Sequence, residues 1–171
     1  MHIISTQDTL QKNTLLYKPL YDETGKVHFI RISQRMNQDD SILFAIILEL
    51  ESLRVLHKKG NIYTIEISKT VKDIVSLIDE SSKSYIESHN VFNTQETPLL
   101  VSQLIPGTEE QCDRLRVKIE QDSWNHIENV RTKFKERCSY KLRCQNIWIH
   151  DQGHYGVTWK VIDIIPHICS S

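Results

Sequence analysis

The residues of this chain whose types and spacing best suit chemistry lie near its C-terminal end, in residues 140–165. The segment reads YKLRCQNIWIHDQGHYGVTWKVIDII, in which two strand-like runs flank the turn-forming HDQGHYG. It mixes three aromatic side chains with three cations, namely Trp148, Tyr155, Trp159, Lys141, Arg143 and Lys160. Flat rings stack on nucleobases and cations neutralise phosphates, so this composition predicts a surface that binds single-stranded nucleic acid. The alternative is that the three rings are core side chains of an ordinary sheet, as most large aromatics are.

A second cationic segment lies at residues 113–120. Leu115, Val117 and Ile119 alternate there with charged residues, a period of two that predicts a strand. Its polar face would carry Arg116 and Lys118, and we add both to the candidate nucleic-acid-binding residues. Between residues 113 and 143 nine cations stand against five acids, although the whole chain has a formal net charge of −1. The predicted basic surface is therefore local.

Two thiols and two imidazoles fall close together in the same region: Cys138, Cys144, His150 and His154. Cys₂His₂ is a standard zinc set, but the spacing is not that of a zinc finger. Six residues of continuous strand would also separate the two thiols by roughly 20 Å. We predict buried thiols and a polar turn, with no metal and no cofactor, and zinc binding stays open as the alternative.

Signals for catalysis are weak. The chain has no GxSxG, P-loop, GxGxxG or HExxH motif. Asp79 and Glu80 lie on a predicted helix, where we expect them to face solvent. A nucleophilic role for Cys144 with His150 or His154 is an open alternative, but no lowered-pKa setting is visible in the sequence. We predict that the protein is not an enzyme and has no catalytic residues.

The elements that must position these residues are mostly strands. Residues 15–21 and 26–33 flank Asp22-Glu23-Thr24-Gly25 and predict a hairpin. Residues 43–50 are apolar and rich in isoleucine, which favours a buried strand over a helix. Residues 54–57 and 61–67 predict a second hairpin, and LLVSQLI, residues 99–105, an extended segment.

Two helices are expected. Residues 70–88 carry Val71, Ile74, Val75, Ile78, Tyr85 and Ile86 on one stripe, with Thr70 and Asp73 arranged like a capping box. A short helix is predicted over residues 123–136, with Trp124 in the core. Together these elements predict an α+β fold, mainly antiparallel, in which an OB-like barrel or sheet is covered by the long helix.

Bulk properties fit one soluble domain. A chain of 171 residues with 39% hydrophobic and 25% charged residues can bury a continuous core without disulfides or metals. We predict a single domain over residues 1–171, with residues 1–13 loosely attached. No leader or membrane-spanning run is recognisable and four cysteines are too few for a disulfide scaffold, so we expect an intracellular protein with no membrane association.

The order of these segments resembles that of the OB-fold single-stranded DNA-binding proteins of nucleocytoplasmic large DNA viruses. The resemblance covers about residues 42–165 and rests on the strand entering the helix with Ile78-Asp79-Glu80, on LRVKI, and on the closing IW…YGVTWKV hairpin. It implies a five-stranded barrel-like core that binds single-stranded DNA with little sequence preference. Carried onto this chain, it implies contacts by Trp148, Trp159, Lys160, Arg116 and Lys118. The chain departs from the pattern because it ends in PHICSS rather than in an acidic tail.

The sequence therefore predicts sequence-tolerant binding of single-stranded DNA in viral replication, recombination or packaging, by stacking and phosphate contacts. The protein would act in the host cytoplasm or nucleus, or in the virion, and replication or virion proteins are further candidate partners. The alternative is a non-enzymatic viral structural or assembly protein that binds other proteins through sheet edges. An unpaired edge would also allow a homodimer. The preference between DNA and RNA is open.

Overall fold

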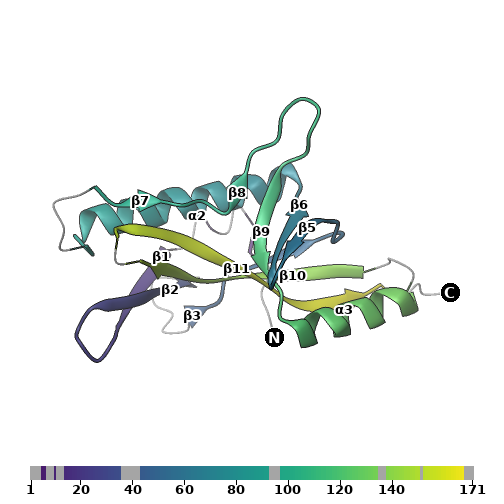
Figure 1. Ribbon diagram of the computed structural model, residues 1–171, viewed down its shortest axis with the longest axis horizontal. Helices are drawn as coiled ribbons and strands as arrows, with labels where there is room; N and C mark the ends of the chain where they lie inside the picture. Colours follow the sequence, from purple (N-terminus) through teal and green to yellow (C-terminus); the bar gives the residue numbers. More distant parts are fainter. Residues whose placement is uncertain are drawn as a thin grey trace.

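The structure of this chain, a computed structural model, describes residues 5–6, 10, 14–35, 43–92, 97–134, 138–150 and 152–167. Within them, eleven strands form one mixed sheet, accompanied by the helices α2 (Lys69–Ser88) and α3 (Gln121–Phe134). The predicted α+β class is confirmed. The sheet runs in the order β1-β2-β10-β11-β9-β6-β5 and does not close on itself (Figure 1), so the described strands do not form the closed barrel that the resemblance implies.

The centre of the sheet is the hairpin formed by the strands β10 (Cys138–Ile149) and β11 (His154–Pro166). These two strands run along the length of the molecule, as Figure 1 shows. This is the aromatic and cationic segment singled out from the sequence, and its predicted hairpin is confirmed. Every other strand of the sheet is connected to this hairpin directly or through one or two intervening strands.

Four strands lie on the β10 side: β1 (Thr14–Tyr21), β2 (Val27–Arg35), β3 (Leu43–Phe44) and β4 (Ile47–Leu50). Strand β4 pairs with the first part of β10 and β2 with its last part. The β1–β2 hairpin is confirmed by the antiparallel pairing of its strands. In its turn, Asp22 Oδ1 accepts hydrogen bonds from the backbone N–H groups of Thr24 and Lys26 at 2.8 and 3.0 Å. Gly25 follows with a φ of 79°, which a residue with a side chain rarely adopts.

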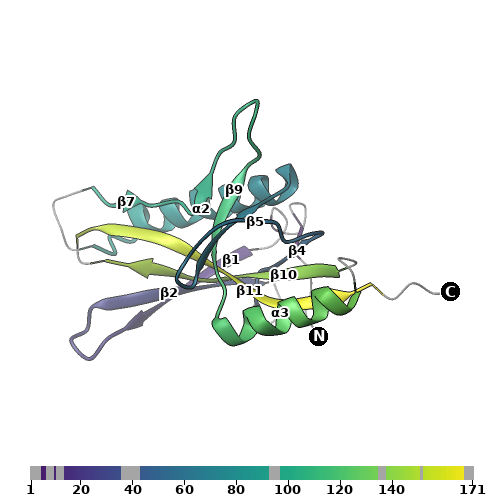
Figure 2. The same ribbon diagram turned by 45° about the vertical axis from the view of Figure 1, so that its right-hand side comes forward.

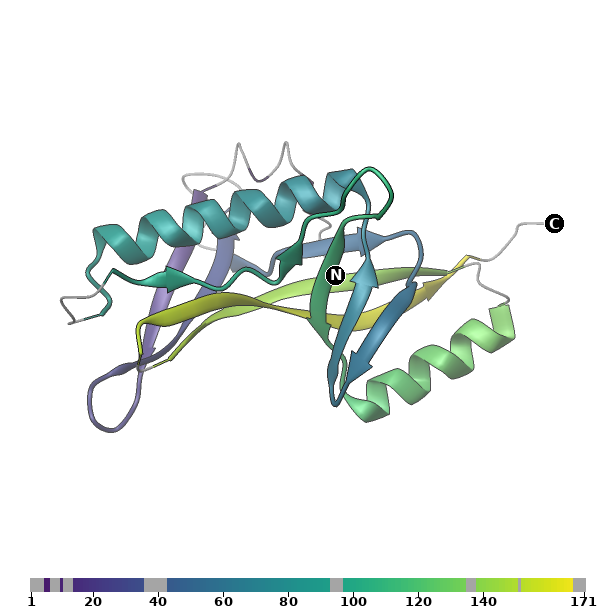
Figure 3. The same ribbon diagram turned by 45° about the horizontal axis from the view of Figure 1, so that its top comes forward.

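Five strands lie on the β11 side: β7 (Leu99–Leu100), β8 (Leu104–Ile105), β9 (Arg114–Lys118), β6 (Ile62–Glu66) and β5 (Val55–Lys59). The β5–β6 hairpin is confirmed, with its strand boundaries shifted, since β5 continues to Lys59 and the turn is Gly60-Asn61. The predicted strand with alternating charges is β9, in which Leu115 and Val117 are buried while Arg116 and Lys118 are exposed. In Figure 3, β9 crosses β11 steeply, and β7 runs beside β11 on the side of α2.

Helix α2 agrees with the predicted stripe, since Val71, Ile74, Val75, Ile78 and Ile86 are buried. The predicted capping box is wrong. The helix begins one residue earlier, and the Ser68 hydroxyl accepts from the Val71 N–H at 3.3 Å. Ser68 takes this role because it follows β6 in an extended conformation, which is the geometry of an N-cap.

Helix α3 packs along β11, beside its C-terminal part (Figure 2). It spans residues 121–134 rather than the predicted 123–136, and residues 135–136 lie outside the described part. Trp124 is half-buried against Tyr63, with ring centroids 4.9 Å apart, so it takes part in packing as expected.

Most of residues 1–13, predicted to be loosely attached, lie outside the described part. Of those described, Ser5 and Leu10 are buried. The Ser5 N–H donates to the Ile47 carbonyl at 2.6 Å, and the Gln34 amide donates to the Ser5 hydroxyl at 2.7 Å. Ser5 therefore contacts the strands next to β10.

Candidate nucleic-acid interface

Helix α2 covers one face of the sheet. Tyr17 of β1 identifies that face, because its hydroxyl donates to Ser81 of α2 at 2.7 Å and its ring stacks on Tyr85 at 4.4 Å. Tyr17 is paired with Ile32 in register, and side chains of paired residues share a face. The same face continues through the buried pair Ile147 and Val157 into the core.

The side chains that alternate with this core face lie on the opposite face of the sheet. Four register pairs align them across the strands: Asn146 with Arg31, Trp148 with Phe29, Arg143 with Lys160, and Lys160 with Lys118. We call these side chains, together with Arg116 two residues before Lys118, the basic face. It carries cations from β2, β9, β10 and β11, and two half-buried rings, Trp148 and Phe29.

A β-bulge makes this arrangement possible. Arg143 and Trp148 are five residues apart, so in a regular strand they would point to opposite faces. The register shifts between Cys144 and Asn146, which inserts Gln145 as an extra residue. The bulge reverses the alternation, and Arg143 and Trp148 then lie on the same face.

The basic face contains two hollows. The smaller, which we call the fork pocket, has a volume of about 250 Å³ and is lined by Arg116, Lys118, Trp148, Trp159, Thr158, Val157, Val117, Ile62 and Gln103. The larger, which we call the basic trough, has a volume of about 640 Å³, and its charged lining residues are Arg31, Arg143 and Lys160. Neither hollow is lined by a carboxylate among the described residues. Both are thus suited to an anionic or acceptor-rich ligand.

The charges of the basic face are largely uncompensated. Among the residues that the structure describes, Arg31, Arg116, Lys118 and Arg143 form no ion pair and are exposed. Lys160 differs, because its ammonium group lies 2.5 Å from a carboxylate oxygen of Glu120. That hydrogen bond holds the pKa of Glu120 below its usual value. Four cations therefore remain available for phosphates.

Lys141 was predicted as a phosphate contact, but its position does not favour that role. Its ammonium group lies 3.3 Å from Asp163, and its side chain is 16% exposed. It lines neither the fork pocket nor the basic trough.

Tyr155 and Trp159 were predicted to contact nucleic acid, and the structure places both in the core, at 0% and 1% exposure. Trp159 is paired with Cys144 on the core face of the sheet, and although it lies beside the fork pocket, an exposure of 1% leaves no face of its ring free for a base. Burial raises the pKa of Tyr155 to about 12, with smaller contributions from the charges of Glu87 and Asp79. Of the three aromatic candidates, Trp148 alone is partly exposed on the basic face.

The cysteine and histidine set is not assembled. Cys138 and Cys144 are buried, and burial raises the pKa of the Cys144 thiol far above its ordinary value. His150 and His154 have ring centroids 6.4 Å apart at the β10–β11 turn. Within the described ranges, no group of three or more His, Cys, Asp or Glu side chains could hold a metal ion.

Asp79 was expected to face solvent, and this prediction is wrong. The side chain is buried at 6% exposure, and Oδ2 accepts from the Ser102 hydroxyl at 2.5 Å. Oδ1 has no hydrogen-bond partner among the described residues. Burial raises the pKa of Asp79 to about 6, while the Ser102 hydrogen bond lowers it and the Glu80 charge raises it. The helical spacing indicates this burial, since residue 79 lies four residues after the buried Val75 and three residues before the buried Ser82.

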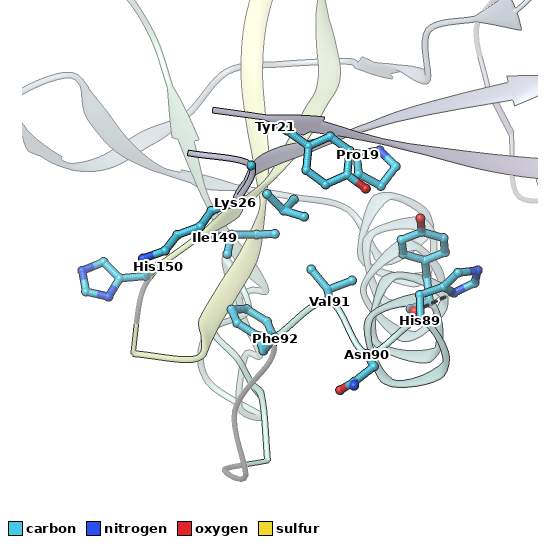
Figure 4. A pocket seen from close by; sticks show the side chains of 12 residues that line it. Pro19, Tyr21, Lys26, His89, Asn90, Val91, Phe92, Ile149 and His150 are labelled. Atoms are coloured by element: carbon cyan, nitrogen blue, oxygen red, sulfur yellow. Dashed lines mark hydrogen bonds between the residues drawn. The ribbon is translucent and has the colours of Figure 1, made fainter. Parts of the chain in front are cut away.

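A separate groove of about 560 Å³ lies where the β1–β2 hairpin, the end of α2 and the β10–β11 turn meet (Figure 4). Its lining includes Tyr21 of β1, Tyr85 of α2, and Val91 and Phe92 of the segment after α2, together with Lys26, His89 and His150. None of the predicted nucleic-acid-binding residues lines it.

Sequence reasoning missed Phe29 and Arg31. The alternating sequence of β2, VHFIRISQR, could have indicated that these two residues share the face opposite the core. Phe29 and Arg31 alternate there with Ile30 and Ile32, which are both buried. The alternation alone could not show that this strand lies beside β10.

Comparison with protein families, curated proteins and solved structures finds no match to this chain. In the described part of the chain, neither helix has the length and apolar character needed to cross a membrane.

Proposed function

We propose that this protein binds single-stranded DNA with little sequence preference, through the basic face. The observation that carries the proposal is the set of four unpaired cations, Arg31, Arg116, Lys118 and Arg143, beside the partly exposed rings of Trp148 and Phe29. Phosphates would lie against the cations, and bases would stack on the rings. This is the arrangement of an electrostatic groove with stacking platforms, and it does not require a closed barrel.

The sheet geometry supports the proposal. The four cations come from three strands, β2, β10 and β9, and they extend across the basic face rather than forming one cluster. A strand crossing the sheet could place successive phosphates on successive cations. The hollows of the basic face would favour single strands over duplexes, because the bases of a duplex are paired inside it and could not enter the hollows.

The resemblance to OB-fold proteins of large DNA viruses extends the proposal. It suggests an elaborated OB-like sheet and a role in viral replication, recombination or packaging, inside the infected cell. The contacts proposed here differ from those that the resemblance implies, since they exclude Trp159 and add Phe29, Arg31 and Arg143.

The test is a titration of a labelled oligo-dT strand, followed by fluorescence anisotropy at low and at physiological salt, with a duplex of equal length as the control. We expect the single strand to bind more tightly than the duplex. If all four cations contact phosphates, the logarithm of the association constant should fall with a slope of about −3 against the logarithm of the salt concentration.

A matched pair of variants locates the site. Lys118→Ala removes an exposed cation of the basic face. The slope of the logarithm of the association constant against the logarithm of the salt concentration should become less steep by about 0.7. Lys83→Ala removes an exposed lysine of α2, which pairs with Glu87, and should leave binding unchanged. Equal effects of the two variants would contradict the proposed face.

The alternative is an assembly protein that binds partners through sheet edges. The strand order ends at β1 and β5, and β5 carries exposed Lys58 and Lys59, a pattern that protects an edge from pairing. Absence of binding to oligo-dT at low salt would favour this alternative.

A further inference from the structure

The fork pocket arises where two strands separate. Strands β9 and β11 share one register pair, Lys118 with Lys160. Beyond it, β11 pairs with β7, and β9 pairs with β8. Gln103, between β7 and β8, spans the gap, and its carbonyl accepts from the Arg116 N–H at 3.0 Å. The pocket is therefore built into the sheet topology.

One wall of the pocket is the indole of Trp148, which lies close to β11 because Gly156 has no side chain. A side chain at position 156 would put its Cβ 2.8 Å from Cζ2 of Trp148 and 2.5 Å from the Val101 carbonyl oxygen. Only glycine leaves room for the indole to lie this close to β11. Trp148 also forms no aromatic pair with another described residue. Its ring is thus a positioned flat surface without a stacking partner.

The polar groups of the pocket are mainly donors. Arg116 and Lys118 contribute cationic N–H groups, and Thr158 contributes a hydroxyl. The Gln103 amide nitrogen already donates to the Val101 carbonyl at 3.2 Å, which fixes the side chain. No carboxylate of the described ranges lines the pocket. A ligand that fits must offer a flat face to Trp148 and acceptors to the two cations.

We propose that the fork pocket holds one nucleobase turned out of the bound strand, and that it prefers guanine to adenine. This inference rests on the proposed function. The volume of about 250 Å³ lies below the roughly 300–1,000 Å³ of pockets for drug-sized ligands, so it suits a single base. Guanine presents two neighbouring acceptors, O6 and N7, whereas adenine presents an amino donor where guanine has O6. The guanidinium of Arg116 matches the guanine pattern.

The experiment compares two strands of about 12 nucleotides, within the roughly 4–16 nucleotides that one such site covers. Each is oligo-dT with one central substitution, guanine in one and adenine in the other, and plain oligo-dT is the reference. Anisotropy titrations should show that the guanine strand binds at least about fivefold more tightly than the adenine strand. A ratio of about fivefold is the lower end of the discrimination that a bidentate base contact provides.

Arg116→Lys is the diagnostic variant, because it keeps the charge and removes the forked donor pair. It should bind the guanine and adenine strands equally, and its own affinity for plain oligo-dT is the reference for both. Arg143→Lys is the matched control in the basic trough and should keep the guanine preference. The thermal midpoint of each variant, compared with wild type, verifies folding.

The outcomes separate the two proposals. Salt-dependent binding of oligo-dT with no guanine preference overturns the base pocket and leaves the proposed function standing. A guanine preference that survives in Arg116→Lys also overturns the assignment of the pocket. No binding of any strand overturns both.

Discussion

The replacement Asp79→Asn should stabilise this protein at neutral pH. Asp79 is a buried carboxyl group on α2. One oxygen accepts a hydrogen bond from Ser102, and the other has no partner within the part of the chain that the structure describes. Its pKa in the folded protein is about 6, against 3.8 for an unperturbed carboxyl. The folded protein therefore binds the proton more tightly than the unfolded chain does. Ionisation of Asp79 opposes folding.

The sign and size follow from linkage. Below about pH 3.8 the carboxyl is protonated in both states and makes no pH-dependent contribution. Destabilisation grows as the pH rises and is complete above about pH 6. Each pKa unit corresponds to about 1.4 kcal/mol, so the full effect is about 3 kcal/mol. Between pH 4 and pH 8, the free energy of unfolding of Asp79→Asn should rise by about 2–3 kcal/mol relative to wild type.

Urea unfolding followed by tryptophan fluorescence, at a series of pH values, measures this difference. Taking the difference between variant and wild type removes the contributions of carboxyl groups that the two proteins share. Ser102→Ala serves as a second variant. It removes the hydrogen bond that lowers the pKa of Asp79, so the loss of stability with rising pH should become larger than in wild type. A difference between Asp79→Asn and wild type that stays constant from pH 4 to pH 8 would refute the reasoning.

Four further predictions concern the sheet and the residues beside it. Trp159→Ala should lower the free energy of unfolding by about 3–5 kcal/mol because the ring is buried. Trp148→Ala should instead weaken oligo-dT binding by about 1–3 kcal/mol, and a larger effect on stability than on binding would remove Trp148 from the interface. Glu120→Gln should release Lys160 and tighten oligo-dT binding at low salt, and unchanged affinity would show that Lys160 does not contact the strand. Gly156→Ala should lower the thermal midpoint and weaken binding together, since the new Cβ meets a backbone oxygen; a midpoint equal to wild type would contradict the close approach.

Much of the local structure was predictable because it depends on neighbouring residues. The buried stripe of α2, the alternation in β9 and the turn at Asp22 all follow from short-range periodicity or turn chemistry. The capping of α2 was predicted wrongly because Ser68 and Thr70 are both good cap residues, and the choice between them depends on where β6 ends.

The candidate site was predicted only in part. Arg116, Lys118, Arg143, Trp148 and Lys160 were selected from the sequence, and the structure brings them to one face. The choice of Tyr155 and Trp159 as nucleic-acid contacts does not agree with their burial. Composition alone cannot tell which of several aromatic side chains in a hairpin is buried in the core. Phe29 and Arg31 come from a strand more than a hundred residues away in sequence from β10, so no local signal links them to it.

The sequence by itself determined which segments are strands and helices, and that cations gather near the C-terminal hairpin, because these properties belong to short stretches of chain. The tertiary structure decided which side chains share a face. The bulge at Gln145 turns Trp148 to the same side as Arg143. The fork pocket exists because β9 and β11 separate beyond their one register pair, Lys118 with Lys160. Both depend on pairing between distant strands, and a shift of one residue in register moves every side chain to the other face.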